Sequence, residues 1–88
     1  MNWQINVSSK AVKALAKIDK KDREKIWYFI KQKLPTLTHP RLVGKSLQGN
    51  LKNMWRYRVG DYRLICEIKD QQVVILVVDI GHRKEIYH

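Results

Sequence analysis

The chain has 88 residues, of which 44% are hydrophobic and 30% are charged, a balance typical of one small folded domain rather than of a disordered segment. Its 18 Lys and Arg against 8 Asp and Glu give a formal net charge of +10, which favours polyanionic partners such as nucleic acid. The longest apolar run, residues 73–78, is far shorter than the roughly 20 residues that span a membrane, and the first residues lack the apolar stretch of a signal peptide. We therefore expect a single cytoplasmic domain over residues 1–88, without a membrane partner.

The first predicted element is a strand, because residues 2–7 alternate apolar and polar side chains. A helix is expected to follow, with Ser8 or Ser9 as its N-cap and its end near Ile18. The apolar side chains of this segment recur at helical spacing, so they should form one stripe that packs on the core while the lysines between them face solvent.

A second, longer helix is predicted from Lys20 to about Leu34, with Asp19 as its N-cap and Pro35 as the signal that ends it. The two helices should form an antiparallel hairpin. From Pro35 to Asn53, the proline, glycine and asparagine residues predict a long loop. Loops longer than about 12 to 15 residues in a compact domain are usually functional.

Two strands joined by a Gly-Asp turn are predicted within residues 54–69. Because side chains two positions apart share a face of a strand, Arg56 and Arg58 should point one way and the aromatic residues beside them the other, toward the core. In the second strand Arg63 and Cys66 should lie on opposite faces. Cys66 is the only cysteine, so it cannot form an internal disulfide and is expected to be a small core residue.

The predicted hairpin brings Arg56, Arg58 and Arg63 together across its two strands. Like charges placed in this way repel one another by a few tenths of a kcal/mol or more unless an anion lies between them. Guanidinium groups bind phosphate oxygens in a bidentate geometry. The hairpin therefore predicts a phosphate site.

A further strand is predicted from Gln72 to Ile80, and Gly81 is expected to end it. The strand is apolar on both faces, as in a central strand that is covered on both sides. The predicted order is β-α-α-β-β-β, an α+β fold with a helical hairpin packed on one face of an antiparallel sheet of about four strands. No spacing typical of a zinc site, a P-loop, paired catalytic carboxylates or a Ser-His-Asp arrangement occurs, so no metal and no cofactor are expected.

This order of elements, with WRYRVGDYRL in the hairpin and GHRKEIY near the end of the chain, resembles the RelE/ParE toxin superfamily and, within it, the RelE-like mRNA interferases. The resemblance extends over nearly the whole chain, and its most specific parts are GDYRL and the final GHRKEIY. It implies a RelE-like fold and the toxin of a type II toxin–antitoxin system. Such toxins cleave messenger RNA, typically in the ribosomal A site, and a cognate antitoxin holds them inactive.

The resemblance also implies roles for individual residues. The two basic residues that the family carries on the first strand of the hairpin correspond to Arg56 and Arg58, and the arginine of its tyrosine-arginine-leucine run corresponds to Arg63. The arginine after the glycine of the last strand corresponds to Arg83, and the terminal tyrosine to Tyr87. In such enzymes these side chains surround the scissile phosphate, and the tyrosine stacks on a base or orients the cleaved nucleotide.

Metal-free cleavage through the RNA 2′-hydroxyl needs a base, cations for the growing negative charge and an acid for the 5′-oxygen. The arginines supply the cations, but arginine does not lose its proton in proteins, and better-known members of the family carry lysines on the first strand of the hairpin. His82 suits proton transfer near neutral pH, although strict alternation puts it opposite Arg83 unless the strand has ended at Gly81. Glu67 and Glu85 are alternatives, and the sequence does not choose among the three.

The leading predicted function is a ribosome-dependent, metal-independent endoribonuclease toxin that arrests translation. Its expected partners are messenger RNA, the ribosomal A site and an antitoxin with an acidic, amphipathic segment that folds on binding. The same fold also serves ParE-like toxins that inhibit gyrase. A non-catalytic module that binds nucleic acid or an antitoxin is the third alternative, because the lysine base is missing.

Overall fold

The computed structural model describes residues 3–47 and 53–82, so the predicted site residues Arg83 and Tyr87, and the alternative base Glu85, lie outside the described residues. In chain order the elements are β1 (Gln4–Val7), α1 (Ser9–Ala16), α2 (Lys20–Tyr28), a π-helical turn (Phe29–Lys33), two 3₁₀ turns (Leu34–Thr36 and Pro40–Leu42), β2 (Lys45–Ser46), β3 (Met54–Val59), β4 (Tyr62–Lys69), a 3₁₀ turn (Asp70–Gln72) and β5 (Val74–His82). None of the described helices is long and apolar enough to cross a membrane.

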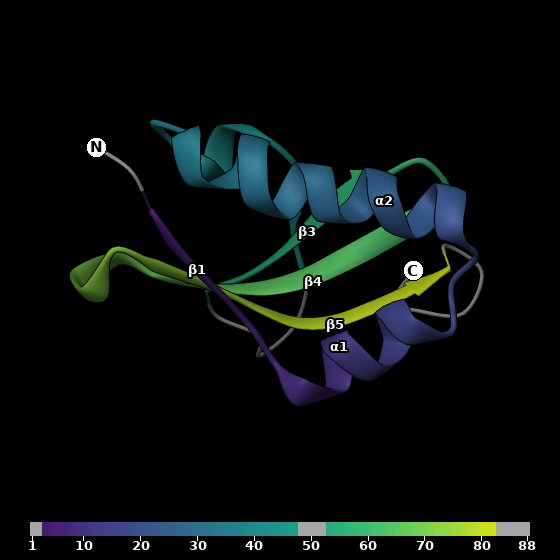
Figure 1. Cartoon of the computed structure of the whole chain (residues 1–88). Coiled ribbons are helices and arrows are strands. Elements are labelled where there is room, and N and C mark those ends of the chain that lie inside the picture. The colour runs from purple at the N-terminus through teal and green to yellow at the C-terminus, as the bar shows by residue number, and fades with distance from the viewer. Residues whose placement is uncertain (1–2, 48–52, 83–88) are drawn as a thin grey trace.

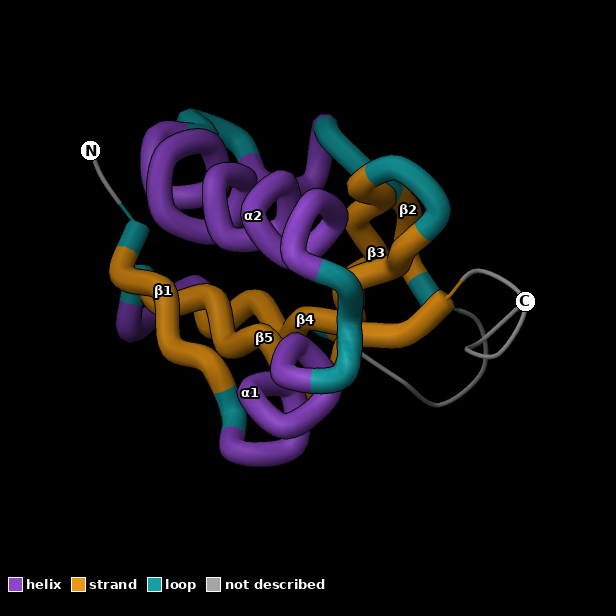
Figure 2. Tube along the Cα trace, turned by 45° about the vertical axis from the view of Figure 1, so that its right-hand side comes forward, coloured by secondary structure: helices purple, strands orange, loops and turns teal. Residues whose placement is uncertain are grey.

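The strands form one sheet in the order β1-β5-β4-β3-β2, in which only β1 and β5 run parallel. The helices α1 and α2 run in opposite directions (Figure 1). Helix α1 packs along β5, whereas α2 lies above β3 and β4 in this view. A second view shows the two helices lying apart from one another (Figure 2). The predicted α+β fold is confirmed, with one strand more than expected because the short β2 forms within the predicted loop.

Ser8 acts as the N-cap of α1, as predicted. Its Oγ accepts a hydrogen bond from the backbone N–H of Ala11 (3.0 Å) and donates one to the carbonyl of Val78 in β5 (2.6 Å). The cap therefore also ties the helix to the sheet. Asp19 occupies the N-cap position of α2, but its carboxyl makes no capping bond. A hydrogen bond with Asp19 instead raises the pKa of the Asp22 carboxyl.

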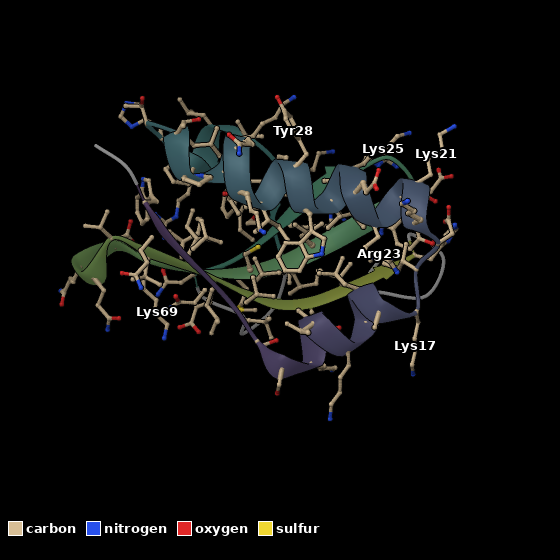
Figure 3. All side chains as sticks on the ribbon, viewed as in Figure 1. Lys17, Lys21, Arg23, Lys25, Tyr28 and Lys69 are labelled. Carbon is tan, nitrogen blue, oxygen red and sulfur yellow. The ribbon has the colours of Figure 1, made fainter. Side chains whose placement is uncertain are left out.

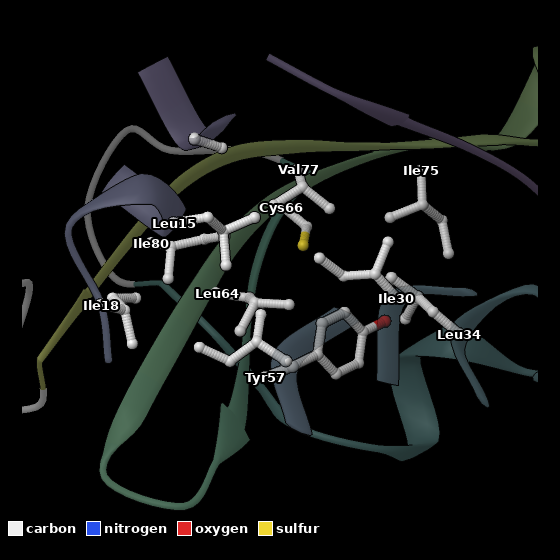
Figure 4. Close-up of a cluster of buried hydrophobic side chains, with 12 residues drawn as sticks. Leu15, Ile18, Ile30, Leu34, Tyr57, Leu64, Cys66, Ile75, Val77 and Ile80 are labelled. Carbon is white, nitrogen blue, oxygen red and sulfur yellow. The ribbon is translucent and has the colours of Figure 1, made fainter. Parts of the chain in front are cut away.

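The core lies between the helices and one face of the sheet. Figure 4 shows Leu15 and Ile30 from the helical layer converging with Tyr57 and Leu64 from the strands. Burying an aliphatic side chain of this size stabilises a fold by about 1.5–3 kcal/mol, so these contacts hold the two layers together. Cys66 is fully buried, which confirms it as a core residue, and this burial raises the pKa of its thiol.

The predicted end of the last strand is wrong. The strand β5 continues through Gly81 to His82, because both residues stay paired with β4. A glycine therefore does not end a strand whose neighbour still supplies ladder hydrogen bonds. The helix predicted from Lys20 to about Leu34 is confirmed in extent, but from Phe29 it is a π-helical turn, in which the N–H of Leu34 bonds to the carbonyl of Phe29.

The loop before β2 is held against β3 by two aromatic side chains. Tyr57 is only 1% exposed, and its hydroxyl donates a hydrogen bond to the carbonyl of Pro40 (2.8 Å). The indole Nε1 of Trp55 donates one to the carbonyl of Val43 (2.6 Å). Burial raises the pKa of the Tyr57 hydroxyl, so it remains a donor over the whole physiological range.

An ion pair fixes the same loop to the turn before β5. The Arg41 guanidinium donates two hydrogen bonds to the Asp70 carboxylate, at 2.7 and 2.9 Å. These bonds hold the pKa of the Asp70 carboxyl below its ordinary value. Both side chains are well exposed, so the pair contributes orientation more than stability.

Two glycines in this region have left-handed backbone conformations. Gly60 (φ +59°) is the first residue of the two-residue turn between β3 and β4, where the predicted hairpin turn places a glycine. Gly44 (φ +78°) precedes β2, and a Cβ atom built on it would overlap the backbone carbonyl of Arg56. The loop can therefore approach β3 this closely only because residue 44 is glycine.

Replacing Tyr57 by Phe removes one buried hydroxyl and leaves the Pro40 carbonyl without its donor. We expect the free energy of unfolding to fall by about 1–2 kcal/mol, measured by urea denaturation. Tyr28→Phe is the matched control, because Tyr28 is 59% exposed and its hydroxyl should matter by less than about 0.5 kcal/mol. Equal stability of Tyr57→Phe and the unaltered protein would contradict this role.

Comparing Gly44→Ala with Gly60→Ala separates two costs, the strain of a positive φ and the overlap of a new Cβ atom with neighbouring atoms. Both place Ala at a positive φ, which costs about 1 kcal/mol, but the Cβ at residue 60 meets nothing within 4 Å. We expect Gly44→Ala to lower the free energy of unfolding by at least about 1 kcal/mol more than Gly60→Ala does, because β3 or the loop must also move. Thermal unfolding of the two variants measures the difference, and equal losses would argue against a tight approach of loop and strand.

Candidate functional site: a basic face of the sheet

The three arginines predicted to converge do share one face of the sheet. Arg58 and Arg63 are directly paired across β3 and β4, and Arg56 pairs with Ile65 two residues further along. Residues opposite one another in an antiparallel pair point the same way, and the neighbouring Tyr57 faces the core. The arginines therefore point away from the helices, as the alternation in the sequence indicates.

The strand β2 adds a cation that the sequence analysis missed. Lys45 pairs with Arg56 across β2 and β3. Together with Gly44, the side chains of Lys45, Arg56, Arg58 and Arg63 line a pocket of ≈ 380 Å³. No local signal marks Lys45, because its position depends on how the long loop returns to β3.

An apolar side chain lies among these charges. Ile65 is only 2% exposed although it points to the face opposite the helices. Arg56 and Arg63 are partly buried beside it, and Arg58 is exposed. Low polarity around a cation strengthens its interaction with a bound anion. The pocket is therefore suited to hold a phosphate group more firmly than exposed lysines on a helix could.

Arg58 and Arg63 lie directly opposite one another, which places two positive charges side by side and so favours the binding of an anion. Several guanidinium and ammonium groups around one phosphate can stabilise the additional negative charge of a phosphoryl-transfer transition state. Within residues 3–47 and 53–82, no group of three His, Cys, Asp or Glu side chains could hold a metal ion. The chemistry that these residues offer is electrostatic.

The structure does not bring His82 to this basic face. Since β5 continues past Gly81, His82 pairs with Tyr62, and their rings meet edge to face with centroids 5.5 Å apart. Tyr62 alternates with Arg63, so both rings lie on the helix side of the sheet, in a pocket that also includes Lys17. His82 could have joined the arginines only if the strand had ended at Gly81, and β5 does not end there.

Glu67 lies on the same face as Arg63 but away from the pocket. The two residues are four positions apart on β4, which corresponds to about 13 Å along a strand. Glu67 pairs with Met54 and Leu76 rather than with an arginine. The roles of Arg83 and Tyr87 stay predictions, because both lie outside the described part of the chain.

Comparison with known proteins shows the family. The protein-family model described as "ParE toxin of type II toxin-antitoxin system, parDE" matches residues 5–87 of this chain. Toxin RelG of Mycobacterium tuberculosis is 35% identical over 48 residues, which are 54% of this chain and 55% of that protein. The aligned part of the chain thus spans about half the length of this curated relative.

Solved structures share the fold. A chain of the RelBE2 toxin–antitoxin complex from Mycobacterium tuberculosis has a TM-score of 0.84 at 24% identity, covering 94% of this chain and 100% of that chain. The archaeal RelE–RelB complex from Pyrococcus horikoshii gives 0.75 at 24% identity, covering 98% and 100%. The isolated RelE toxin of E. coli gives 0.70 at 20% identity, covering 91% and 83%. With the family model covering nearly all of its length, the chain belongs to the RelE/ParE superfamily of toxins of type II toxin–antitoxin systems.

Proposed function

We propose that this toxin is an mRNA endoribonuclease that acts in the ribosomal A site and is held inactive by a cognate antitoxin. Family membership supports the class of toxin, and the basic face supports the substrate. The observation that carries the proposal is the convergence of Arg56, Arg58 and Arg63 with Lys45 around one pocket. A net charge of +10 would also attract the protein to ribosomal RNA.

In the proposed reaction the RNA 2′-oxygen attacks the adjacent phosphorus while the bond to the 5′-oxygen breaks. The leaving 5′-oxygen takes up a proton from water, so a 2′,3′-cyclic phosphate and a free 5′-hydroxyl result, and no metal ion is needed. The arginines bind the non-bridging oxygens, whose charge grows toward the transition state. As the family resemblance implies, Arg83 would add a further cation, and Tyr87 would stack on a base at about 1–3 kcal/mol.

We propose that the side-chain amine of Lys45, in its neutral form, accepts the proton of the 2′-hydroxyl and becomes an ammonium group. Among the described residues that line the pocket, Lys45 alone has a side chain that can exchange a proton, because the guanidinium of arginine keeps its protons. Lysine is also the residue type that better-known members of the family carry at this step, although on the first strand of the hairpin rather than on β2. His82 fits this role less well, since it lies on the other face of the sheet.

Gyrase inhibition is the second candidate, and the observation that favours it is the ParE description of the matching family model. Potent inhibition of supercoiling by the purified toxin, without new 5′ ends in messenger RNA, would select this function. Translation arrest with intact transcripts would instead select a non-catalytic module that binds RNA. Messenger RNA cleavage within reading frames is the outcome that we expect.

Brief induction of the toxin in cells, followed by mapping of transcript 5′ ends, tests the proposal. We expect new ends within coding regions, and we expect Arg63→Ala to reduce their number at least about 100-fold, because a cation at the phosphate is lost. Lys13→Ala is the control, since it removes one exposed charge from α1 on the other face of the sheet. Neither arrest nor cleavage, with the altered and unaltered forms behaving identically, would refute endoribonuclease activity.

Lys45→Arg tests whether Lys45 accepts the proton of the 2′-hydroxyl, separately from the positive charge that it contributes to the pocket. The variant keeps the cation, so we expect RNA affinity to change less than about twofold, while single-turnover cleavage on programmed ribosomes slows by about 100-fold or more. Binding of a labelled mRNA fragment to the purified protein measures the first quantity. Cleavage at the normal rate would show that the proton passes through another group.

A further inference from the structure

The place of the Lys45 amine in the pocket depends on how the backbone of β2 is held. Lys45 is exposed, and its ammonium group sits on a flexible four-carbon stem. Its strand β2 is two residues long, lies at the edge of the sheet and pairs with β3 alone. A strand this short has few ladder hydrogen bonds of its own. Contacts beside β2 must therefore keep the amine next to the arginines.

The indole of Trp55 provides such a contact two residues before Lys45. Its Nε1 donates a hydrogen bond to the carbonyl of Val43 (2.6 Å), and two residues span at most about 7 Å of chain. The Tyr57 hydroxyl acts further away, because it bonds to the carbonyl of Pro40, five residues before the lysine. Of these two hydrogen bonds, the one from Trp55 has the more direct hold on Lys45.

Gly44, between Val43 and Lys45, lets the backbone come this close to the ring of Trp55. A Cβ atom built on Gly44 would lie 3.1 Å from the indole Nε1, which is the donor of the hydrogen bond to Val43. Trp55 itself is half-buried and packs against the core, so its ring has a fixed place. The hydrogen bond therefore joins the rigid core to the backbone that carries Lys45.

The lysines of the helical layer do not replace Lys45. Figure 3 shows Lys21 and Lys25 projecting from the outer side of α2, away from the sheet. Lys13 and Lys17 line a pocket on the helix side of the sheet. Among the described residues that line the pocket of the basic face, Lys45 alone can exchange a proton. A displacement of β2 would therefore remove the proton acceptor while the arginines of β3 and β4 stay in place.

We propose that Trp55 is a positioning residue: its indole N–H holds the Val43 carbonyl and so keeps the amine of Lys45 in the pocket of the basic face. The effect of Trp55 on cleavage rests on the proposed function, because it acts through the group that accepts the 2′-hydroxyl proton. The hold of Trp55 on β2 does not rest on that function. A displacement of about 1 Å at a reacting group can slow a reaction about 100-fold.

Trp55→Phe keeps an aromatic ring against the core but has no N–H to donate. With purified toxin in excess over programmed ribosomes, we expect the maximal rate of single-turnover cleavage to fall about tenfold or more. The toxin concentration that gives half of this rate should change less than about twofold, because the arginines still bind the RNA. Trp27→Phe is the matched control, since Trp27 is also half-buried and packs against the core. It should change both quantities less than about twofold.

Combination with Lys45→Arg separates positioning from a general loss of structure. Arginine at position 45 cannot accept the proton, so in this background Trp55 has no acceptor to position. We expect Trp55→Phe to slow cleavage less than about twofold when it is added to Lys45→Arg. A tenfold loss in both backgrounds would overturn the proposal, because a purely structural effect of Trp55 does not depend on lysine at position 45.

Hydrogen exchange tests the hold on β2 without RNA. The N–H of Leu47, directly after β2, bonds to the carbonyl of Met54 in β3 (3.3 Å). We expect this amide to exchange at least about tenfold faster in Trp55→Phe than in Trp27→Phe, because β2 opens more often. The amide of Ser8, which bonds to a carbonyl of β5, is the reference and should exchange equally in the two variants.

The two measurements separate this proposal from the proposed function. If the unaltered protein cleaves RNA and Trp55→Phe loses no more activity than Trp27→Phe, the positioning role alone is wrong. Equal exchange of the Leu47 amide in the two variants would overturn the hold on β2. No cleavage by the unaltered protein would refute the proposed function, and with it the effect of Trp55 on the rate, while faster exchange in Trp55→Phe would still support the hold on β2.

Discussion

The register of the β3–β4 hairpin is the constraint on which both faces of the protein depend. Strict alternation means that Tyr57 reaches the core only when Arg56 and Arg58 point the other way. A slip of one residue would bury two guanidinium groups, at a cost of several kcal/mol for each charge, whereas the observed opposition of Arg58 and Arg63 costs only a few tenths. Core burial therefore decides the register, and the basic face follows from it.

Much of this arrangement could be predicted from local signals. Ser8 precedes a helix and caps it, and the glycine at residue 60 marks the hairpin turn that a left-handed residue requires. The alternation around Arg56 and Arg58 gave the correct face for both, because a strand has only two faces to choose from. Where a feature depends on neighbours in the sequence, a single sequence is informative.

The rest depends on contacts between distant residues. Lys45 joins the arginines because a long loop, held by the aromatic residues of β3, returns to pair with Arg56. His82 lies on the helix side because β4 still pairs with β5 beyond Gly81. The π-helical turn begins at Phe29, where the ring packs against Tyr57. No periodicity in the chain specifies these pairings, since each is set by a partner far away in the sequence.

The parallel pairing of β1 with β5 affects the order in which the sheet can form while the protein is synthesised. These strands are far apart in the sequence, since Gln4 pairs with Val74, and within the described residues β1 has no other strand as a neighbour in the sheet. Contacts between such distant segments close late, because a long loop must be ordered first. During synthesis β1 cannot pair within the sheet until the ribosome has translated β5. The sheet is completed only after β5 has emerged, so β1 joins it after the hairpin of β3 and β4 has been synthesised.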